Sequence, residues 1–155
     1  NAAGEVVELD ILKGKVIGVY FSAHWCSPCQ SFTPKLVKYR DENKDKFEVV
    51  FISSDRSKKA KQEYMNKSKM NWLTLPWRSP TANALVQKFE KTEIPFLVLL
   101  NDKGALLTKE GHSLISRDIN IDKLHTVREI YEKYKCGRCK KIHVRKKLVY
   151  GDESK

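Results

Sequence analysis

The sequence has no long apolar run, no glycine-rich nucleotide-binding fingerprint and no internal repeat. A transmembrane helix needs about 20 consecutive apolar residues, and no segment of this 155-residue chain approaches that length, so we expect no membrane span. The chain is long enough for one ordinary domain and has no room for a flavin or nicotinamide domain. We therefore expect a globular domain without an organic cofactor.

Acidic residues are scarce at the end of the chain, which makes the charge uneven. Residues 133–155 carry 9 Lys/Arg against 2 Asp/Glu, whereas residues 1–132 carry 21 against 17. Most of the net charge of +11 therefore lies in a basic tail. No recognisable nucleic-acid-binding fold accompanies this tail, so we interpret it as solvent-exposed. Contact with nucleic acid, acidic proteins or nuclear import machinery is the alternative.

The four cysteines are not scattered but form two C-x-x-C pairs, Cys26/Cys29 and Cys136/Cys139. A secreted domain stapled by disulfides is usually shorter, with its cysteines spread along the chain. Two close pairs indicate redox chemistry or metal binding in a reducing compartment. We expect the cytoplasm, and the basic tail adds the nucleus as a second location.

Apolar patterning predicts strands that alternate with helices. Val16–Phe21 and Phe47–Ile52 are short, continuously apolar runs, typical of strands buried on both faces. The further predicted elements are helices at 27–43, 58–67, 83–91 and 121–134, a short strand within 70–82, and a hairpin of strands 94–100 and 105–109. This order predicts an α/β fold whose central sheet has helices on both faces.

The first cysteine pair stands where a predicted strand ends and a helix begins. Cysteine attacks as the thiolate, and free N–H groups and the dipole at a helix N-terminus stabilise that anion. Cys29 follows Cys26 by one helical turn, close enough for a disulfide, and Pro28 is tolerated in the first turn. Half of a zinc site and inert core cysteines are the alternatives. Zinc needs four ligands, and the next pair begins 107 positions after Cys29.

The segment Val19–Cys29 resembles the active-site segment of tryparedoxins and nucleoredoxins, which are thioredoxin-fold proteins. The resemblance continues through Met70–Pro76 and Glu93–Gly104 and covers roughly residues 5–134. It implies a thioredoxin fold, in which helices flank both faces of a central mixed β-sheet. Residues 1–134 would then form a thioredoxin-like domain, and residues 135–155 a basic C-terminal tail with the second C-x-x-C pair.

The resemblance also implies a function. Cys26 and Cys29 would be the catalytic dithiol of a protein-disulfide reductase, and Ile94–Pro95 would be a cis peptide facing it. The residues expected to contact substrate are Trp25, Ser27, Pro28, Ile94 and Pro95. The implied partners are disulfide-containing proteins and an external thiol reductant. The alternative is a nucleoredoxin-type adaptor that binds partners in a redox-dependent way with little turnover.

Two positions depart from the family pattern, one differs from ordinary thioredoxins, and one lacks an assigned role. Ser27 replaces the first proline of the usual W-C-P-P-C motif, and Gln30 stands where the family often has a basic residue. Tyr20 occupies the position at which ordinary thioredoxins carry a buried Asp. His24 either tunes the thiolate or fills a variable surface position, and we favour the second interpretation.

The second pair, Cys136/Cys139, lies beyond the segment that the resemblance covers. It could form a second redox pair, or have no role beyond two exposed thiols or a passive disulfide. A zinc site is the third interpretation, because Cys136, Cys139 and His143 have ligand-like spacing and His125 would complete the set. The sequence alone leaves all three open, and we assign no metal.

Overall fold

The structure of the chain is a computed structural model that describes residue 1 and residues 3–124. The described elements in chain order are η1 (Leu9–Leu12), β1 (Val16–Ser22), α1 (Ser27–Glu42), β2 (Phe47–Ser53), α2 (Lys58–Lys67), β3 (Leu73–Thr74), α3 (Pro80–Lys88), β4 (Phe96–Leu100), β5 (Leu106–Thr108) and α4 (Gly111–Ser116). Most of the helix predicted at 121–134, and the whole of the predicted tail, lie outside the described residues.

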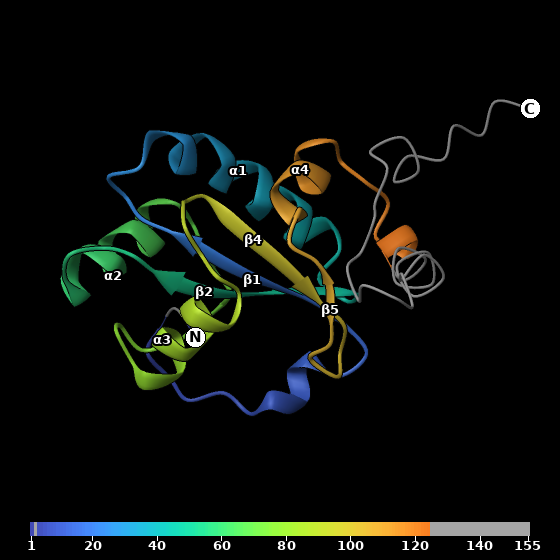
Figure 1. Cartoon of the computed structure of the whole chain (residues 1–155), viewed down its shortest axis with the longest axis horizontal. Coiled ribbons are helices and arrows are strands. Elements are labelled where there is room, and N and C mark those ends of the chain that lie inside the picture. Colours follow the sequence, from blue (N-terminus) through green and yellow to red (C-terminus); the bar gives the residue numbers. More distant parts are fainter. Residues whose placement is uncertain (2, 125–155) are drawn as a thin grey trace, which may run out of the picture.

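The described strands form one mixed sheet in the order β3-β2-β1-β4-β5. β1 pairs in parallel with β2, and β2 in parallel with β3. On its other side β1 pairs antiparallel with β4, which in turn pairs antiparallel with β5. Every residue of β1 is buried, as its apolar sequence predicts for the middle of a sheet. Figure 1 shows this sheet between helices, which confirms the predicted α/β fold with a mixed sheet.

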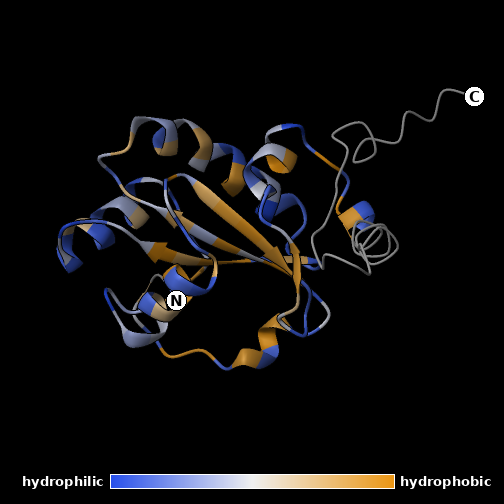
Figure 2. Cartoon of the chain, in the orientation of Figure 1, coloured by the Kyte–Doolittle hydropathy of each residue, from blue (hydrophilic) through white to orange (hydrophobic). Residues whose placement is uncertain are grey.

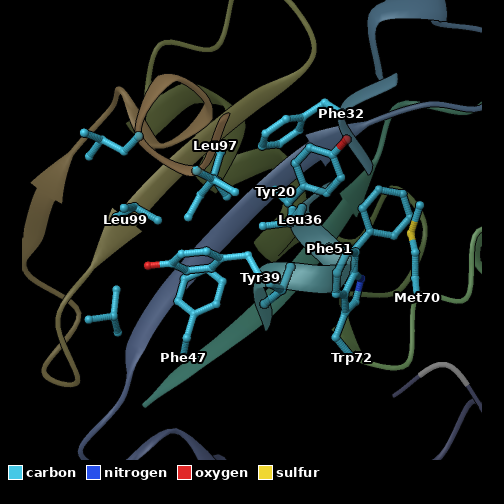
Figure 3. Packing of buried hydrophobic residues seen from close by; sticks show 14 of the residues in the cluster. Tyr20, Phe32, Leu36, Tyr39, Phe47, Phe51, Met70, Trp72, Leu97 and Leu99 are labelled. Carbon is cyan, nitrogen blue, oxygen red and sulfur yellow. The ribbon is translucent and has the colours of Figure 1, made fainter. Parts of the chain in front are cut away.

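Alternate residues of the central strands belong to two separate hydrophobic cores, because successive side chains of a strand point to opposite faces of the sheet. Tyr20 of β1, Phe47 and Phe51 of β2, and Leu97 of β4 belong to the first core. Several of its aromatic rings meet edge to face, as Tyr39 of α1 does with Phe47 at a centroid distance of 5.3 Å (Figure 3). The second core holds Ile17, Val19, Phe21, Ile52, Val98 and Leu100.

Helices cover both cores. Apolar residues of α1, α2 and α4 pack into the first core, and those of α3 pack into the second. In Figure 1, α1 and α4 lie above the sheet, and α3 and η1 lie below it. Figure 2 shows β4 orange along its length, whereas α2 is mostly blue. Within the described residues, no helix is long and apolar enough to cross a membrane.

The structure moves several predicted boundaries, two of them for clear physical reasons. α3 begins at Pro80, three residues before the predicted start, because Ser79 Oγ accepts a hydrogen bond from Ala82 N and Pro80 occupies the first turn. The predicted strand at 94–100 begins at Phe96, since the residues before it form the loop with Pro95.

The sequence patterns did not predict α4. This helix has only six residues, and its buried side chains Leu114 and Ile115 make too short a pattern to detect. It is fixed by close packing on β4: a Cβ atom on Gly111 would lie 2.7 Å from Leu97 O. Tertiary contact with the sheet, rather than local periodicity, therefore defines this element.

Candidate active site

Cys26 and Cys29 lie at the junction of β1 and α1, as their spacing predicts. The chain makes a turn between β1 and the cysteines, and in this turn the backbone N–H of Cys26 donates to the Ala23 carbonyl oxygen at 3.3 Å. Cys26 is the N-cap of α1, and Cys29 N donates to Cys26 Sγ at 3.3 Å. The two cysteines form a disulfide with a Cα–Cα separation of 5.2 Å. The helix therefore holds one sulfur at its amino end and the other one turn inside.

The two sulfur-bearing residues differ in their access to solvent. Cys26 is 7% exposed, whereas Cys29 is fully buried beneath the first turn of α1. No acidic residue occupies that first turn, so the N–H groups and the positive end of the helix dipole are not offset by a carboxylate. A thiolate at Cys26 would be stabilised there, and a substrate disulfide would reach Cys26 before Cys29.

Ile94 and Pro95 lie directly beside the disulfide. β4 pairs antiparallel with β1, and its register places Phe96 opposite Phe21, five positions before Cys26. The Ile94–Pro95 peptide is cis, which confirms the conformation implied by the family resemblance. Cys26 Sγ lies 3.7 Å from the carbonyl oxygen of Ile94. Two segments that are 68 positions apart therefore form one site.

The other predicted contact residues form the exposed rim of this site. Trp25 is 51% exposed, and Ser27 and Pro28 are exposed on the first turn of α1. A large exposed aromatic ring beside a reactive sulfur offers apolar contact area to a partner. The structure thus brings Trp25, Ser27 and Pro28 together with Ile94 and Pro95 around the sulfur of Cys26.

The structure assigns His24 a partner that the sequence did not indicate. Its backbone N–H and its ring Nδ1 both contact Oδ1 of Asp55, at 2.9 and 2.7 Å. Because an ionised carboxylate only accepts, Nδ1 carries the proton and donates it. The amide of Gln30 also donates to the His24 carbonyl. Our preferred interpretation of His24 as a variable surface position therefore omitted a specific contact.

Asp55 is buried, and both of its carboxylate oxygens accept hydrogen bonds. Ser53 Oγ donates to its second oxygen, Oδ2, at 2.8 Å. The sequence held one signal for this pairing: Asp55 comes just after β2, and the carboxyl ends of parallel strands meet at the same edge of a sheet. Ser22 and Ser53 are register partners, which places Asp55 next to the turn that precedes Cys26.

A chain of buried hydroxyl groups lies behind the disulfide. Thr33 Oγ1 donates to Cys29 O at 2.8 Å and lies 2.8 Å from both the Tyr20 and the Tyr64 hydroxyl groups. Tyr64 OH in turn lies 3.0 Å from Ser22 Oγ. Burial raises the pKa of Tyr20 above its usual value, so this phenol stays protonated. The position that holds a buried carboxyl in ordinary thioredoxins is here part of a neutral network.

The metal-binding alternative concerns residues that lie elsewhere. Cys136, Cys139, His143 and His125 are all outside the described residues. Among residues 1 and 3–124, no group of three or more His, Cys, Asp or Glu side chains is placed to hold a metal ion. The three interpretations of the second cysteine pair therefore stay predictions.

Comparison with known proteins places the chain in a family. Residues 14–106 match the family model described as thioredoxin-like. Probable nucleoredoxin 1 of Arabidopsis thaliana is 44% identical over 115 residues, which are 72% of this chain and 20% of that protein. Nucleoredoxin of Xenopus laevis is 38% identical over 117 residues, 73% of this chain and 28% of that protein. The chain thus spans about a quarter of the length of these curated relatives.

Solved structures support the same relationship. Tryparedoxin II from C. fasciculata has 35% sequence identity and a TM-score of 0.68, over 75% of this chain and 78% of that one. Thioredoxin from Wuchereria bancrofti has 35% identity and a TM-score of 0.70, over 83% of this chain and 92% of that one. These relatives support thiol–disulfide oxidoreductase chemistry in general. The chain belongs to the thioredoxin-like family, in the branch that contains the tryparedoxins and nucleoredoxins.

Proposed function

We propose that this domain reduces disulfides in protein substrates through a dithiol–disulfide cycle of Cys26 and Cys29. The observation that carries the proposal is the pairing of a solvent-accessible sulfur at the N-cap of α1 with a buried sulfur one turn behind it. The accessible sulfur is suited to attack a substrate. The buried sulfur is suited to release that substrate from within, without competing for it.

The cycle begins with the reduced enzyme. The thiolate of Cys26 attacks one sulfur of the substrate disulfide, a Cys26–substrate bond forms, and the other substrate sulfur leaves as a thiolate and takes a proton from solvent. Cys29 then gives up its proton and attacks Cys26 Sγ. The Cys26–Cys29 bond forms, the mixed disulfide breaks, and the second substrate thiolate departs and is protonated.

The electrons then have to be replaced. The substrate has gained two electrons and two protons in the cycle, and the enzyme has become the Cys26–Cys29 disulfide. An external thiol reductant restores the dithiol by the same exchange in reverse. A reducing compartment such as the cytoplasm would supply it, and this location is part of the proposal.

Five residues would bind the substrate around the reacting sulfur. Ile94 presents its backbone carbonyl 3.7 Å from Cys26 Sγ, where an extended substrate segment can pair with the chain. Pro95 follows Ile94 in the same loop, and the exposed residues Trp25, Ser27 and Pro28 would contact the substrate from the α1 side of the sulfur. We further propose that residues 1–134 form the catalytic domain and residues 135–155 an accessory tail.

Reduction of insulin disulfides with dithiothreitol as the regenerating thiol tests the proposal. We expect the wild-type chain to accelerate reduction, Cys26→Ser to abolish the acceleration, and Cys29→Ser to trap a mixed disulfide that is visible by mass spectrometry. Cys136→Ser/Cys139→Ser is the matched control and should retain activity. A wild-type rate equal to that of dithiothreitol alone would contradict the proposed reductase activity and favour a redox-dependent adaptor.

A further inference from the structure

Three helices begin at the same edge of the sheet as the disulfide. α1, α2 and α3 each follow one of the parallel strands β1, β2 and β3, whose carboxyl ends meet at that edge. In Figure 1 this is the end to which the β1 and β2 arrows point. Each helix N-terminus contributes a partial positive charge there. The fold itself thus makes the surroundings of the disulfide electropositive.

The sequence strengthens this charge instead of offsetting it. Acidic residues stabilise a first helical turn, yet none of α1, α2 and α3 has one there. α2 starts with Lys58 and Lys59. The N-termini of these three helices all lie at the edge with the disulfide, and none has a stabilising acidic residue in its first turn. No acid in these first turns therefore offsets the partial positive charge at this edge.

Asp55 accepts hydrogen bonds that hold a basic and an aromatic side chain at this edge. Its carboxylate holds His24, and its backbone carbonyl accepts a hydrogen bond from Trp77 Nε1 at 2.9 Å. The Arg78 guanidinium lies over the Trp77 ring, 4.6 Å from the centroid. Arg56, the next residue after Asp55, is exposed. In the part of the chain that the structure describes, neither arginine forms an ion pair.

The acids near this edge offset only part of its positive charge. Asp55 has a side chain that is fully buried, and it accepts three hydrogen bonds. Glu90 points its carboxylate at Lys109, 3.1 Å away. Glu93 is an exposed acid on the loop before β4. Lys91, two positions earlier, donates from its ammonium group to Ser54 Oγ at 3.1 Å. The exposed groups His24, Arg56, Lys58 and Arg78 form what we call the basic edge.

We propose that the basic edge is a docking surface for acidic segments that flank the disulfide of a protein substrate. The inference rests on the proposed function and names the substrate class of that same site. Arginine forks bind carboxylates in bidentate fashion, and a positive field concentrates acidic partners and raises their association rate. Trp25, next to the basic edge, adds apolar contact once the acidic segment has docked.

The test uses two synthetic peptides of equal length, each with one intramolecular disulfide, flanked by four Glu in one and by four Lys in the other. The full chain reduces each peptide with dithiothreitol as the regenerating thiol, and kcat/KM is measured at low and high salt. We expect the Glu peptide to be preferred about tenfold at low salt, with a smaller preference at high salt. The ratio of the two values is the readout, so a general loss of activity does not affect it.

Two charge-reversal variants locate the effect. Arg56→Glu/Arg78→Glu should reduce the ratio to about one or below. Lys44→Glu/Lys103→Glu is the matched control, because these exposed lysines lie at the opposite edge of the sheet and change the net charge equally. It should keep the wild-type ratio. If the charge-reversal variant does not fold, Arg56→Gln/Arg78→Gln replaces it. This variant introduces no new charge and should give a ratio between one and the wild-type value.

Each contrary outcome has a distinct meaning. A wild-type chain that reduces both peptides equally well would overturn the docking surface and leave the proposed reductase intact. A chain that reduces neither peptide faster than dithiothreitol alone would overturn the reductase itself. Equal losses in both charge-reversal variants would show that net charge, and not the basic edge, selects the substrate.

Discussion

Asp55 Oδ1 accepts hydrogen bonds from both the backbone N–H and the ring Nδ1–H of His24, at 2.9 and 2.7 Å. The carboxylate is buried, whereas the His24 side chain is 51% exposed. One acid therefore fixes both the main chain and the side chain of a residue that is two positions from Cys26. The loop after β2 holds the turn after β1 in place, and with it the start of α1.

Replacing this carboxylate should destabilise the protein. Asp55→Asn keeps the shape but exchanges an acceptor for an amide that also donates, so the bonds from His24 and Ser53 cannot all form. We expect the free energy of unfolding to fall by about 1.5–3 kcal/mol, measured by urea denaturation. Asp102→Asn, at an exposed turn, is the control and should change it by less than about 0.5 kcal/mol. Equal effects would show that the buried carboxylate contributes nothing specific.

The buried hydroxyl network should depend on Thr33. Thr33→Val removes the oxygen that contacts Tyr20, Tyr64 and Cys29 O, so each of these groups loses one hydrogen bond, and Ser22 remains as a partner of Tyr64. We expect the free energy of unfolding to fall by about 1–3 kcal/mol. The matched control is Ser31→Ala on the exposed face of the same helix, whose loss should be small. A fully stable Thr33→Val variant would mean that the network rearranges around the methyl group.

The short helix α4 should tolerate no side chain at its first residue. In Gly111→Ala the new methyl group would lie 2.7 Å from Leu97 O and 2.8 Å from Leu97 Cγ, so α4 must move away from β4. We expect a destabilisation of about 1–3 kcal/mol in thermal or urea unfolding. Ser113→Ala, two residues along the same helix, should be nearly neutral. Wild-type stability in Gly111→Ala would contradict the packing of α4 on the sheet.

Stability should decrease with pH below about 6.5 through His112. Burial lowers the pKa of this imidazole, Lys35 lowers it further, and Glu110 acts in the opposite direction. His112 also packs on Phe32, with ring centroids 4.3 Å apart. Because the unfolded chain has the higher pKa, it binds more protons as the pH falls below 6.5, and the folded state loses stability through that window.

The His112→Gln variant isolates this contribution. Urea denaturation of both proteins between pH 5 and 7.5 should show a smaller decrease for the variant than for the wild type. The other titrating groups are common to the two proteins, so their difference reports on residue 112. Parallel pH profiles would contradict a partly buried imidazole whose pKa is lowered in the folded state.

The local parts of the site were predictable because short-range patterns encode them. Val16–Phe21 is apolar throughout and forms a strand buried on both faces. The cysteines follow it at the spacing of one helical turn, so their place at the start of α1 follows from the sequence. The α2 helix, Lys58–Lys67, matches its predicted bounds because a serine cap and a charged surface mark it clearly. Periodicity and capping act over a few residues and need no knowledge of the rest of the chain.

The relations between distant segments were decided by the tertiary structure. The contact of His24 with Asp55, the Thr33–Tyr64 hydroxyl pair and the position of Ile94 beside Cys26 join residues 31, 31 and 68 positions apart. Each depends on the register of β1 with its neighbours, and α4 exists only where Gly111 meets β4. The sequence by itself determined which residues could do the chemistry and where along the chain they stand. The tertiary structure decided which side chains surround them, because strand pairing and the packing of helices on the sheet bring segments far apart in sequence within hydrogen-bonding distance.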